Sequence, residues 1–299
     1  MNRGVLVGIG AYFLWGMFPI YWRLLEQDPA IEILAHRMVW SLVFMMGVMI
    51  IQGEISWLKK ALQNRRLLAI YSMAAILLSL NWYTYIWAVN AGYVVEASLG
   101  YFINPLVNFL LGVIFFHEKL RFGQLAAVIL AVLGVVYLTF NYGSLPWISL
   151  VLAFSFGIYG LIKKAAPLES ARGFSLETSV MFLPALGFLI HRQVSGAGAF
   201  VNQGTVVTLL LVVTGLVTSI PLLMFGYSAR NIPLSMLGFI QYIAPTLQFL
   251  IGVFVYFEPF PITRLIGFSI IWLALILYSL EAILYNRKLK SNTSLVKPV

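Results

Sequence analysis

The sequence predicts an all-α integral membrane protein whose ten transmembrane helices form two inverted repeats of five. Composition is the first indication. Of the 299 residues, 61% are hydrophobic and only 10% are charged, and the mean hydropathy is +0.94, values typical of polytopic membrane proteins. The second and third indications are an internal repeat and the uneven distribution of basic residues. Because the chain contains no cysteine, disulfides, thiol catalysis and thiolate metal sites are excluded.

The internal repeat joins two apolar segments, 96–118 and 236–258, which align at an offset of 140 residues without a gap. Counting from the proline in the middle of each segment, six of fourteen positions are identical, whereas apolar segments would share roughly one or two by chance. Both segments end on a glutamate, Glu118 or Glu258, and this match predicts a shared structural role. The chain is therefore interpreted as a duplicated membrane protein.

Ten apolar runs are long enough to cross a bilayer as helices, and turn-forming stretches separate them. Each repeat holds five spans, an odd number, so the second half must enter the membrane from the opposite side. We expect a first repeat at 1–141, a second repeat at 142–286 and a disordered tail at 287–299. The spans are predicted at about 4–24, 32–52, 67–90, 95–116, 122–140, 145–163, 174–192, 205–228, 234–257 and 263–285.

The basic residues indicate the orientation of these spans. Fifteen of the 19 lysines and arginines fall in segments on the same side as the N-terminus, and only three fall on the other side. Positive residues concentrate in cytoplasmic loops, so both termini are predicted to be cytoplasmic. The net charge of +9 is thereby attributed to membrane orientation, and nucleic acid is not expected as a partner.

Polar side chains recur on one face of the repeated helix. Tyr101, Asn104 and Asn108 follow helical spacing, and Gln241 and Gln248 occupy the positions equivalent to Tyr101 and Asn108 in the second repeat. Polar groups at this depth are costly unless they face protein or water. We expect this face to line a substrate-binding cavity; the alternative is a set of interhelical hydrogen bonds that only holds the bundle together.

Three further residues are candidates for the same cavity. Asn81 and Tyr85 lie four residues apart in the third span and share a helix face, whereas Trp82 and Trp87 are predicted to point elsewhere. Trp15 is a candidate wall residue, although aromatic packing in the core explains it equally well.

Charged residues within or near the spans are candidates for gating or coupling. Arg37 is expected inside the second span, where a charge needs a partner or water. It either forms a structural ion pair with Glu96, or it gates the outer mouth or anchors an anionic group of the substrate. His36 titrates near neutral pH when unperturbed. Glu177 is the approximate counterpart of Arg37 in the second repeat, and Arg230 is its expected partner.

Four strings make the chain similar to a known family: 36–41 (HRMVWS), 81–90 (NWYTYIWAVN), 96–105 (EASLGYFINP) and 238–246 (GFIQYIAPT). Together they resemble the RarD proteins, which belong to the EamA-type branch of the drug/metabolite transporter (DMT) superfamily. The resemblance extends over about residues 4–285. It implies the ten-helix inverted-repeat fold, a bacterial inner membrane and transport of small organic solutes.

The leading functional prediction is a secondary-active permease that works by alternating access at a mid-membrane cavity. It would need a small-molecule substrate, membrane lipids and no cofactor, with protons as a candidate coupling ion. No nucleotide-binding loop is present. The alternatives are an uncoupled facilitator and a lipid scramblase or channel. An intramembrane enzyme is disfavoured because the chain has a single aspartate and no cysteine. The sequence indicates neither substrate, direction nor oligomeric state.

Overall fold

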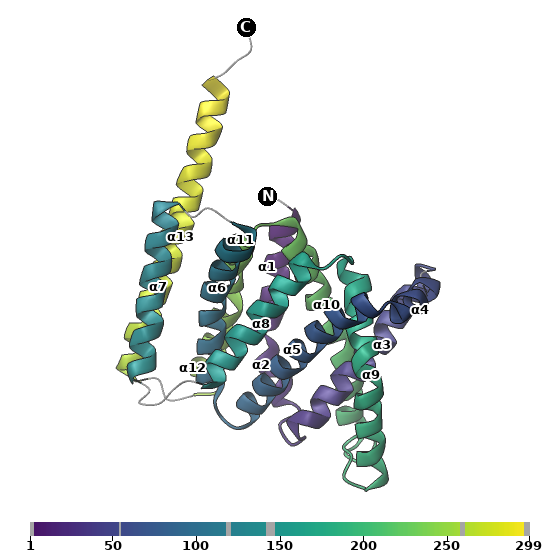
Figure 1. Ribbon diagram of the computed structural model, residues 1–299. Helices are drawn as coiled ribbons and strands as arrows, with labels where there is room; N and C mark the ends of the chain where they lie inside the picture. Colours follow the sequence, from purple (N-terminus) through teal and green to yellow (C-terminus); the bar gives the residue numbers. More distant parts are fainter. Residues whose placement is uncertain (1–2, 54, 118–120, 142–146, 258–260, 296–299) are drawn as a thin grey trace.

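The computed structural model of the protein describes residues 3–53, 55–117, 121–141, 147–257 and 261–295. Within these ranges all regular secondary structure is helical (Figure 1). The helices are α1 (Arg3–Gly16), α2 (Phe18–Arg23), α3 (Ala30–Ile51), α4 (Ile55–Gln63), α5 (Arg65–Asn90), α6 (Val94–Phe116), α7 (Phe122–Asn141), α8 (Trp147–Ala165), α9 (Ser170–Val194), α10 (Thr205–Asn231), α11 (Leu234–Gln241), α12 (Ile243–Phe254) and α13 (Ile262–Leu295).

The membrane-spanning segments agree with the predicted spans. In the described part of the chain, nine helical segments are long and apolar enough to cross a membrane, counting α1 with α2 and α11 with α12 as one segment each. A shorter apolar stretch in α13, Leu265–Tyr278, falls on the tenth predicted span. The predicted all-α membrane fold is therefore confirmed.

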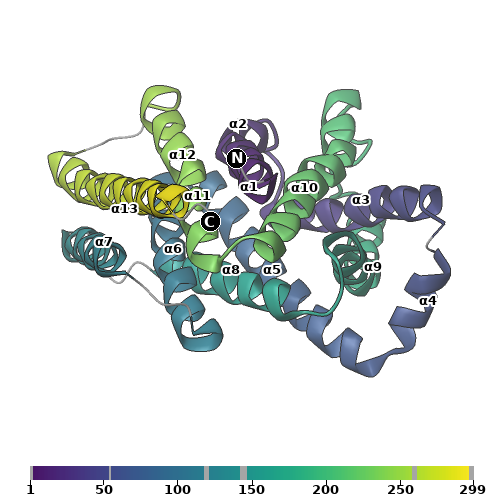
Figure 2. The same cartoon turned by 90° about the horizontal axis from the view of Figure 1, so that it is seen from above.

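The contacts between helices follow the predicted two-fold relation of the repeats. If the repeats are exchanged, α3 corresponds to α9, α5 to α10, α6 to α11 and α12, and α1 to α8. The contact of α3 with α10 then maps onto that of α9 with α5, and the contact of α6 with α8 onto that of α11 and α12 with α1. The pair of α7 and α13 maps onto itself, and Figures 1 and 2 show these two helices side by side at one edge of the bundle.

Small residues allow two of these helix pairs to approach closely. A Cβ added at Gly215 would lie 2.5 Å from the carbonyl carbon of Trp40, so α10 and α3 nearly touch through their backbones. At Gly100, an added Cβ would lie 2.8 Å from the carbonyl oxygen of Ser149 on α8. Close backbone approach at small residues is a common source of helix association in membranes.

The two repeats differ at their central prolines. Pro105 lies inside α6, which continues through it as a single helix. In the second repeat the helix is interrupted at Tyr242, between α11 and α12 and three residues before Pro245, although Tyr242 keeps helical dihedrals. Gln241, at the end of α11, is buried here and is 2% exposed.

One predicted feature is corrected. The segment expected to be a disordered tail begins inside α13, which remains helical to Leu295 (Figure 1). The chain holds no glycine or proline between residues 287 and 295, so nothing in its composition stops the helix there. Glu118 and Glu258, for which a shared structural role was predicted, lie outside the described residues.

Candidate functional site

A cavity lies between helices of both repeats, beside the largest cluster of buried apolar side chains. It leaves about 30 Å³ for the centres of water molecules, which is room for about two waters. Its walls come from α1 and α2, from α3, α5, α6 and α8, and from α11 and α12. The lining residues are Tyr12, Trp15, Phe18, Arg37, Asn81, Trp82, Tyr85, Tyr101, Phe156, Gln241, Ala244, Pro245 and Gln248.

Arg37 is the only charged residue in this lining as described, and it is 1% exposed. Its guanidinium carbon lies 3.9 Å from the ring centroid of Trp82 and 4.6 Å from that of Trp22, a cation–π arrangement. Its Nε donates to Thr218 Oγ1 at 3.0 Å, and its Nη1 has no hydrogen-bond partner. The predicted ion pair with Glu96 is not formed, because the guanidinium lies between the two indole rings and bonds to α10 instead.

Three predicted polar residues line the cavity and at the same time hold its walls together. Asn81 Nδ2 donates to the carbonyl of Leu152 at 2.9 Å, and Asn81 Oδ1 accepts from the Tyr101 hydroxyl at 3.4 Å. Gln248 Nε2 donates to the carbonyl of Trp15 at 3.1 Å. These bonds connect α5 to α6 and α8, and α12 to α1. Trp15 itself lines the cavity, as the cavity hypothesis requires.

Asn104 and Asn108 lie behind the cavity wall, in a network with Gln241. Gln241 Nε2 donates to Asn104 Oδ1 at 2.7 Å, and Asn108 Nδ2 donates to Gln241 Oε1 at 2.9 Å. Asn108 Nδ2 also lies 3.0 Å from Asn104 Oδ1, while Asn104 Nδ2 donates to the carbonyl of Ala153 at 2.8 Å. Of the five residues on the predicted polar face, Tyr101, Gln241 and Gln248 therefore line the cavity. Asn104 and Asn108 do not, and they form interhelical hydrogen bonds, as in the alternative interpretation.

The prediction that Trp82 points away from the cavity is wrong. Residues three apart also share a helix face, so Trp82 and Tyr85 line the cavity together, and Trp82 covers one face of Arg37. Five further lining residues were not predicted, since apolar and aromatic positions in membrane helices carry little signal of whether they face lipid, protein or a cavity. These are Tyr12, Phe18, Phe156, Ala244 and Pro245.

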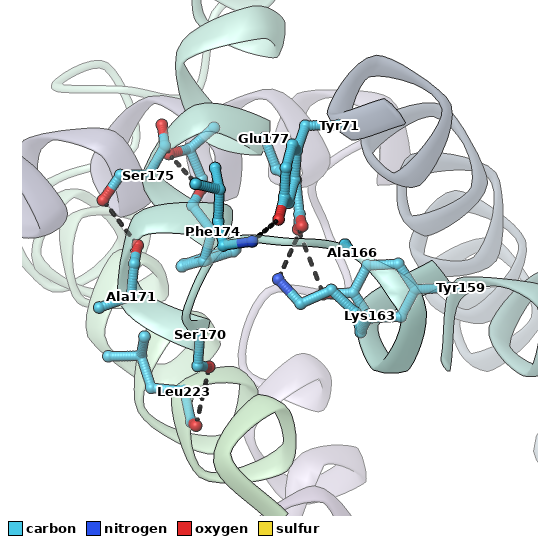
Figure 3. Close-up of polar contacts among 12 residues, drawn as sticks. Tyr71, Tyr159, Lys163, Ala166, Ser170, Ala171, Phe174, Ser175, Glu177 and Leu223 are labelled. Carbon is cyan, nitrogen blue, oxygen red and sulfur yellow. Dashed lines mark hydrogen bonds and ion pairs between the residues drawn. The ribbon is translucent and has the colours of Figure 1, made fainter. Parts of the chain in front are cut away.

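Glu177 belongs to a second polar cluster, whose contacts are shown in Figure 3 and whose residues are not part of the cavity lining. Lys163 Nζ lies 2.8 Å from Glu177 Oε1, with the two side chains 5% and 2% exposed. The Tyr159 hydroxyl donates to Glu177 Oε2 at 3.2 Å, and the rings of Tyr159 and Tyr71 each lie 5.8 Å from Lys163 Nζ. Arg230, the predicted partner of Glu177, instead donates to two backbone carbonyls between α8 and α9. Lys163 on α8 takes its place as the partner of the carboxylate.

The start of α3 holds a buried acid that the sequence analysis did not single out. Glu32 is 1% exposed, and its Oε2 accepts from Arg192 at 2.8 Å, while its Oε1 accepts from the backbone N–H of Ala199 at 2.6 Å. This ion pair ties α3 to the far end of α9. An acidic residue in the first turn of a helix is usually explained by the helix dipole, so its position did not mark Glu32 as one half of a buried ion pair.

His36 does not face the cavity around Arg37. Its ring stacks on Phe200 with centroids 5.3 Å apart, and Trp40 Nε1 donates to its Nδ1 at 3.3 Å. Together with Glu32 it lines a separate recess of about 290 Å³ between α3 and α9. The four groups predicted for gating or coupling thus occupy different places: Arg37 in the cavity, Glu177 in its own cluster, His36 in this recess and Glu96 in the first turn of α6.

A bundle of apolar helices, built from two related halves around a buried and largely aromatic cavity, is an arrangement typical of multi-pass membrane transporters, and the comparisons with known proteins agree. Residues 2–140 match the EamA-like transporter family. An uncharacterised transporter of Bacillus subtilis, YojE, is 48% identical over 97% of this chain and 98% of its own length. The protein RarD of Streptomyces exfoliatus is 45% identical over 99% and 94% of the two chains, and that of Escherichia coli 42% identical over 96% and 97%.

The chain therefore belongs to the RarD proteins of the EamA-like transporter family, within the drug/metabolite transporter superfamily. A solved crystal structure of a protein shares the fold, with a TM-score of 0.65 and 17% identity over 93% of this chain and 98% of the other. The protein is a multi-pass bacterial membrane transporter.

Proposed function

We propose that this transporter is a secondary carrier that moves small organic solutes by alternating access around the cavity at Arg37. The observation that carries the proposal is the buried guanidinium in a cavity lined by helices of both repeats, with no ion pair to an acid among the described residues. Charged groups at membrane depth are costly and in most cases mark substrate or ion pathways. The two-fold relation of the helices supports alternating access, because such repeats can exchange roles when one side opens and the other closes.

In this proposal the Glu177 cluster closes the end of the bundle that carries the N-terminus. The bonds from Glu177 to Lys163 and Tyr159 join α9 to α8, and the Tyr71 hydroxyl accepts from the backbone N–H of Leu168. Opening toward that side requires α8 and α9 to separate here. Such rigid-body rocking of one repeat against the other is the expected movement.

We assign residues 1–141 and 142–286 to the two repeats, and 287–299 to a C-terminal extension. The match of the family to residues 2–140 supports the first boundary. The basic residues support an inner-membrane protein with both termini cytoplasmic, since 15 of 19 lie on that side. Single cysteines at Gln63 and Gln203, both exposed, should react with impermeant reagents from the cytoplasm and the periplasm respectively. Labelling of both from one side would contradict this topology.

The carrier is proposed to be free of catalytic activity and cofactors. Protons are the candidate coupling ion, and Glu96, Glu177 and His36 are the candidate groups. An uncoupled facilitator is the main alternative, and a channel or scramblase is a further one. A channel would require a continuous polar pathway, whereas the described cavity is confined and largely aromatic in its lining.

The test is solute flux into liposomes that contain the purified protein, using solutes first found in a thermal-shift screen. A carrier should show saturable flux and exchange of labelled for unlabelled solute; flux that rises linearly with concentration would contradict it. A pH gradient should drive uphill flux if protons are coupled, and Glu177→Gln, Glu96→Gln or His36→Gln should weaken that effect. Glu26→Gln, at an exposed acid outside the spans, is the matched control.

A further inference from the structure

We infer that the cavity takes small organic monocarboxylates with an aromatic or otherwise apolar body and no ammonium group. The inference rests on the proposed carrier function, because it names the class of solute for the same site. Its basis is the set of polar atoms in the lining that have no partner within the described protein.

Three buried polar atoms of the lining lack a hydrogen-bond partner: Arg37 Nη1, Tyr85 Oη and Tyr12 Oη. The guanidinium can only donate, and each hydroxyl carries one hydrogen that it can donate. A buried donor without an acceptor is costly. A ligand that brings acceptor atoms would satisfy Arg37 Nη1, and the oxygen atoms of an oxyanion are the strongest acceptors for a guanidinium.

The amide N–H groups of the lining already donate within the protein, and Gln248 Nε2 bonds to the carbonyl of Trp15. Both polar atoms of Gln241 bond to Asn104 and Asn108. Asn81 donates to α8 and accepts from Tyr101. The buried atoms of the lining residues that lack a partner therefore all belong to groups that can donate, and one of these groups carries the positive charge.

The charge of the cavity lining limits which oxyanions can bind. Arg37 is the only charged group in the lining as described, and that lining contains no aspartate or glutamate. One fixed positive charge matches a monoanion such as a carboxylate, whereas a phosphate dianion would enter with uncompensated charge. A zwitterionic amino acid would bring an ammonium group with no carboxylate to receive it, at a desolvation cost that buried charges repay only when paired.

The rest of the lining selects the body of the solute. Trp15 and Phe156 meet edge to face with centroids 5.5 Å apart, and Trp82 and Phe18 complete an aromatic wall. Flat apolar groups bind well between such rings. Since the cavity now leaves room for about two waters, a solute must move these rings apart, so binding is coupled to a rearrangement of α1 and α8.

The experiment uses three probes of one shape: phenylacetate, its neutral amide phenylacetamide, and phenylglycine, which adds an ammonium group. Binding of radiolabelled phenylacetate to the purified full-length protein in detergent is measured, with the other two as competitors. We expect saturable binding, with phenylacetamide and phenylglycine each at least about tenfold weaker. Arg37→Met should weaken binding at least about tenfold, Arg37→Lys should retain part of it, and Arg65→Met, at an exposed arginine, should leave it unchanged.

Equal competition by phenylacetamide, stronger competition by phenylglycine, or unchanged binding by a folded Arg37→Met variant would each overturn the inference. The competitor series on the wild-type protein decides the question even if the Arg37 variants do not fold. Saturable flux of other solutes without any binding of phenylacetate would overturn the inference and leave the carrier standing. Binding of phenylacetate with the expected selectivity, but without flux in liposomes, would support the site and overturn the carrier.

Discussion

Two buried charges at equivalent positions of the repeats are held in different ways. Arg37 and Glu177 are 140 residues apart, and each is the eighth residue of its helix. Glu177 is bonded to Lys163 and Tyr159 within the protein. Arg37 lies between two indole rings with a single hydrogen bond, from its Nε to Thr218.

The difference separates a charge that is paired within the protein from one that is open to a ligand. At Glu177 the protein supplies the counter-charge, so the cluster is complete and can act as a closed contact between helices. At Arg37 the rings offset part of the desolvation cost, and the remaining donor capacity faces a cavity. Residues at equivalent positions of an inverted repeat can therefore have different roles.

The largest effect is expected from Lys163→Met. The substitution leaves Glu177 buried without its counter-charge, and breaking a buried ion pair from one side costs about 3–5 kcal/mol. The midpoint of thermal unfolding in detergent should fall strongly. The double variant Lys163→Met, Glu177→Met should recover most of the loss, because no lone charge remains. If Lys163→Met were as stable as the wild type, the Glu177 cluster could not be distinguished from the Arg37 site by its internal ion pair.

A second difference between the repeats concerns Asn108 and Gln248, which are also 140 residues apart. Asn108 lies in the network behind the wall, and Gln248 lies in the wall itself. Asn108→Leu leaves Gln241 Oε1 without its donor, so we expect a loss of about 1–3 kcal/mol in stability, measured by thermal unfolding. Asn141→Leu, at an exposed amide, is the control and should have a much smaller effect.

Gln248→Leu should instead impair solute binding more than stability. If Asn108→Leu and Gln248→Leu proved equally destabilising and equally defective in binding, the two positions would play the same role after all.

The sequence was sufficient for the spans, the repeat and most of the polar cavity wall, because composition and helical periodicity determine which residues share a face. Side-chain partners depend on how helices of different repeats are rotated against each other, which local patterns do not encode. Lys163, at the end of a predicted span, looked like an ordinary cytoplasmic anchor, so its bond to Glu177 was missed. The partners of Arg37 were missed for the same reason, since Trp22 and Thr218 come from α2 and α10.

For Arg37→Met we expect a change in stability within about 1 kcal/mol, in contrast to Lys163→Met. The variant loses the cation–π contacts, but it also removes a desolvated charge without leaving an acid unpaired. Solute flux in liposomes should nevertheless be lost, as is common where function depends on a strained or costly group. A strongly destabilised Arg37→Met variant would mean that Arg37 is mainly structural.

The smallest effect is expected at Asp28, which lies at the same end of the bundle as Arg37 and likewise forms no ion pair among the described residues. Its side chain is buried, and neither carboxylate oxygen has a hydrogen-bond partner of good geometry. Burial, and then the neighbouring carboxylate of Glu32, raise the pKa of Asp28 above its ordinary value of 3.8, and the nearby side chain of Gln203 offsets a smaller part of this rise. Between these two pKa values the folded protein binds more protons than the unfolded chain, so stability rises as pH falls through the raised pKa and levels off below 3.8.

Asp28→Asn removes this titration, because the amide is neutral at every pH. We therefore expect the variant to be at least as stable as the wild type near pH 7. As the pH is lowered toward about 4, the stability of the wild type should rise relative to that of the variant. Thermal unfolding in detergent across this range measures the difference. Glu26→Gln, at an exposed acid of the same connection, should follow the wild type throughout. If the stability of Asp28→Asn showed the same pH dependence as the wild type, the Asp28 carboxylate would have a partner in solution. The groups at the end of the bundle around Arg37 would then be better paired than the structure indicates.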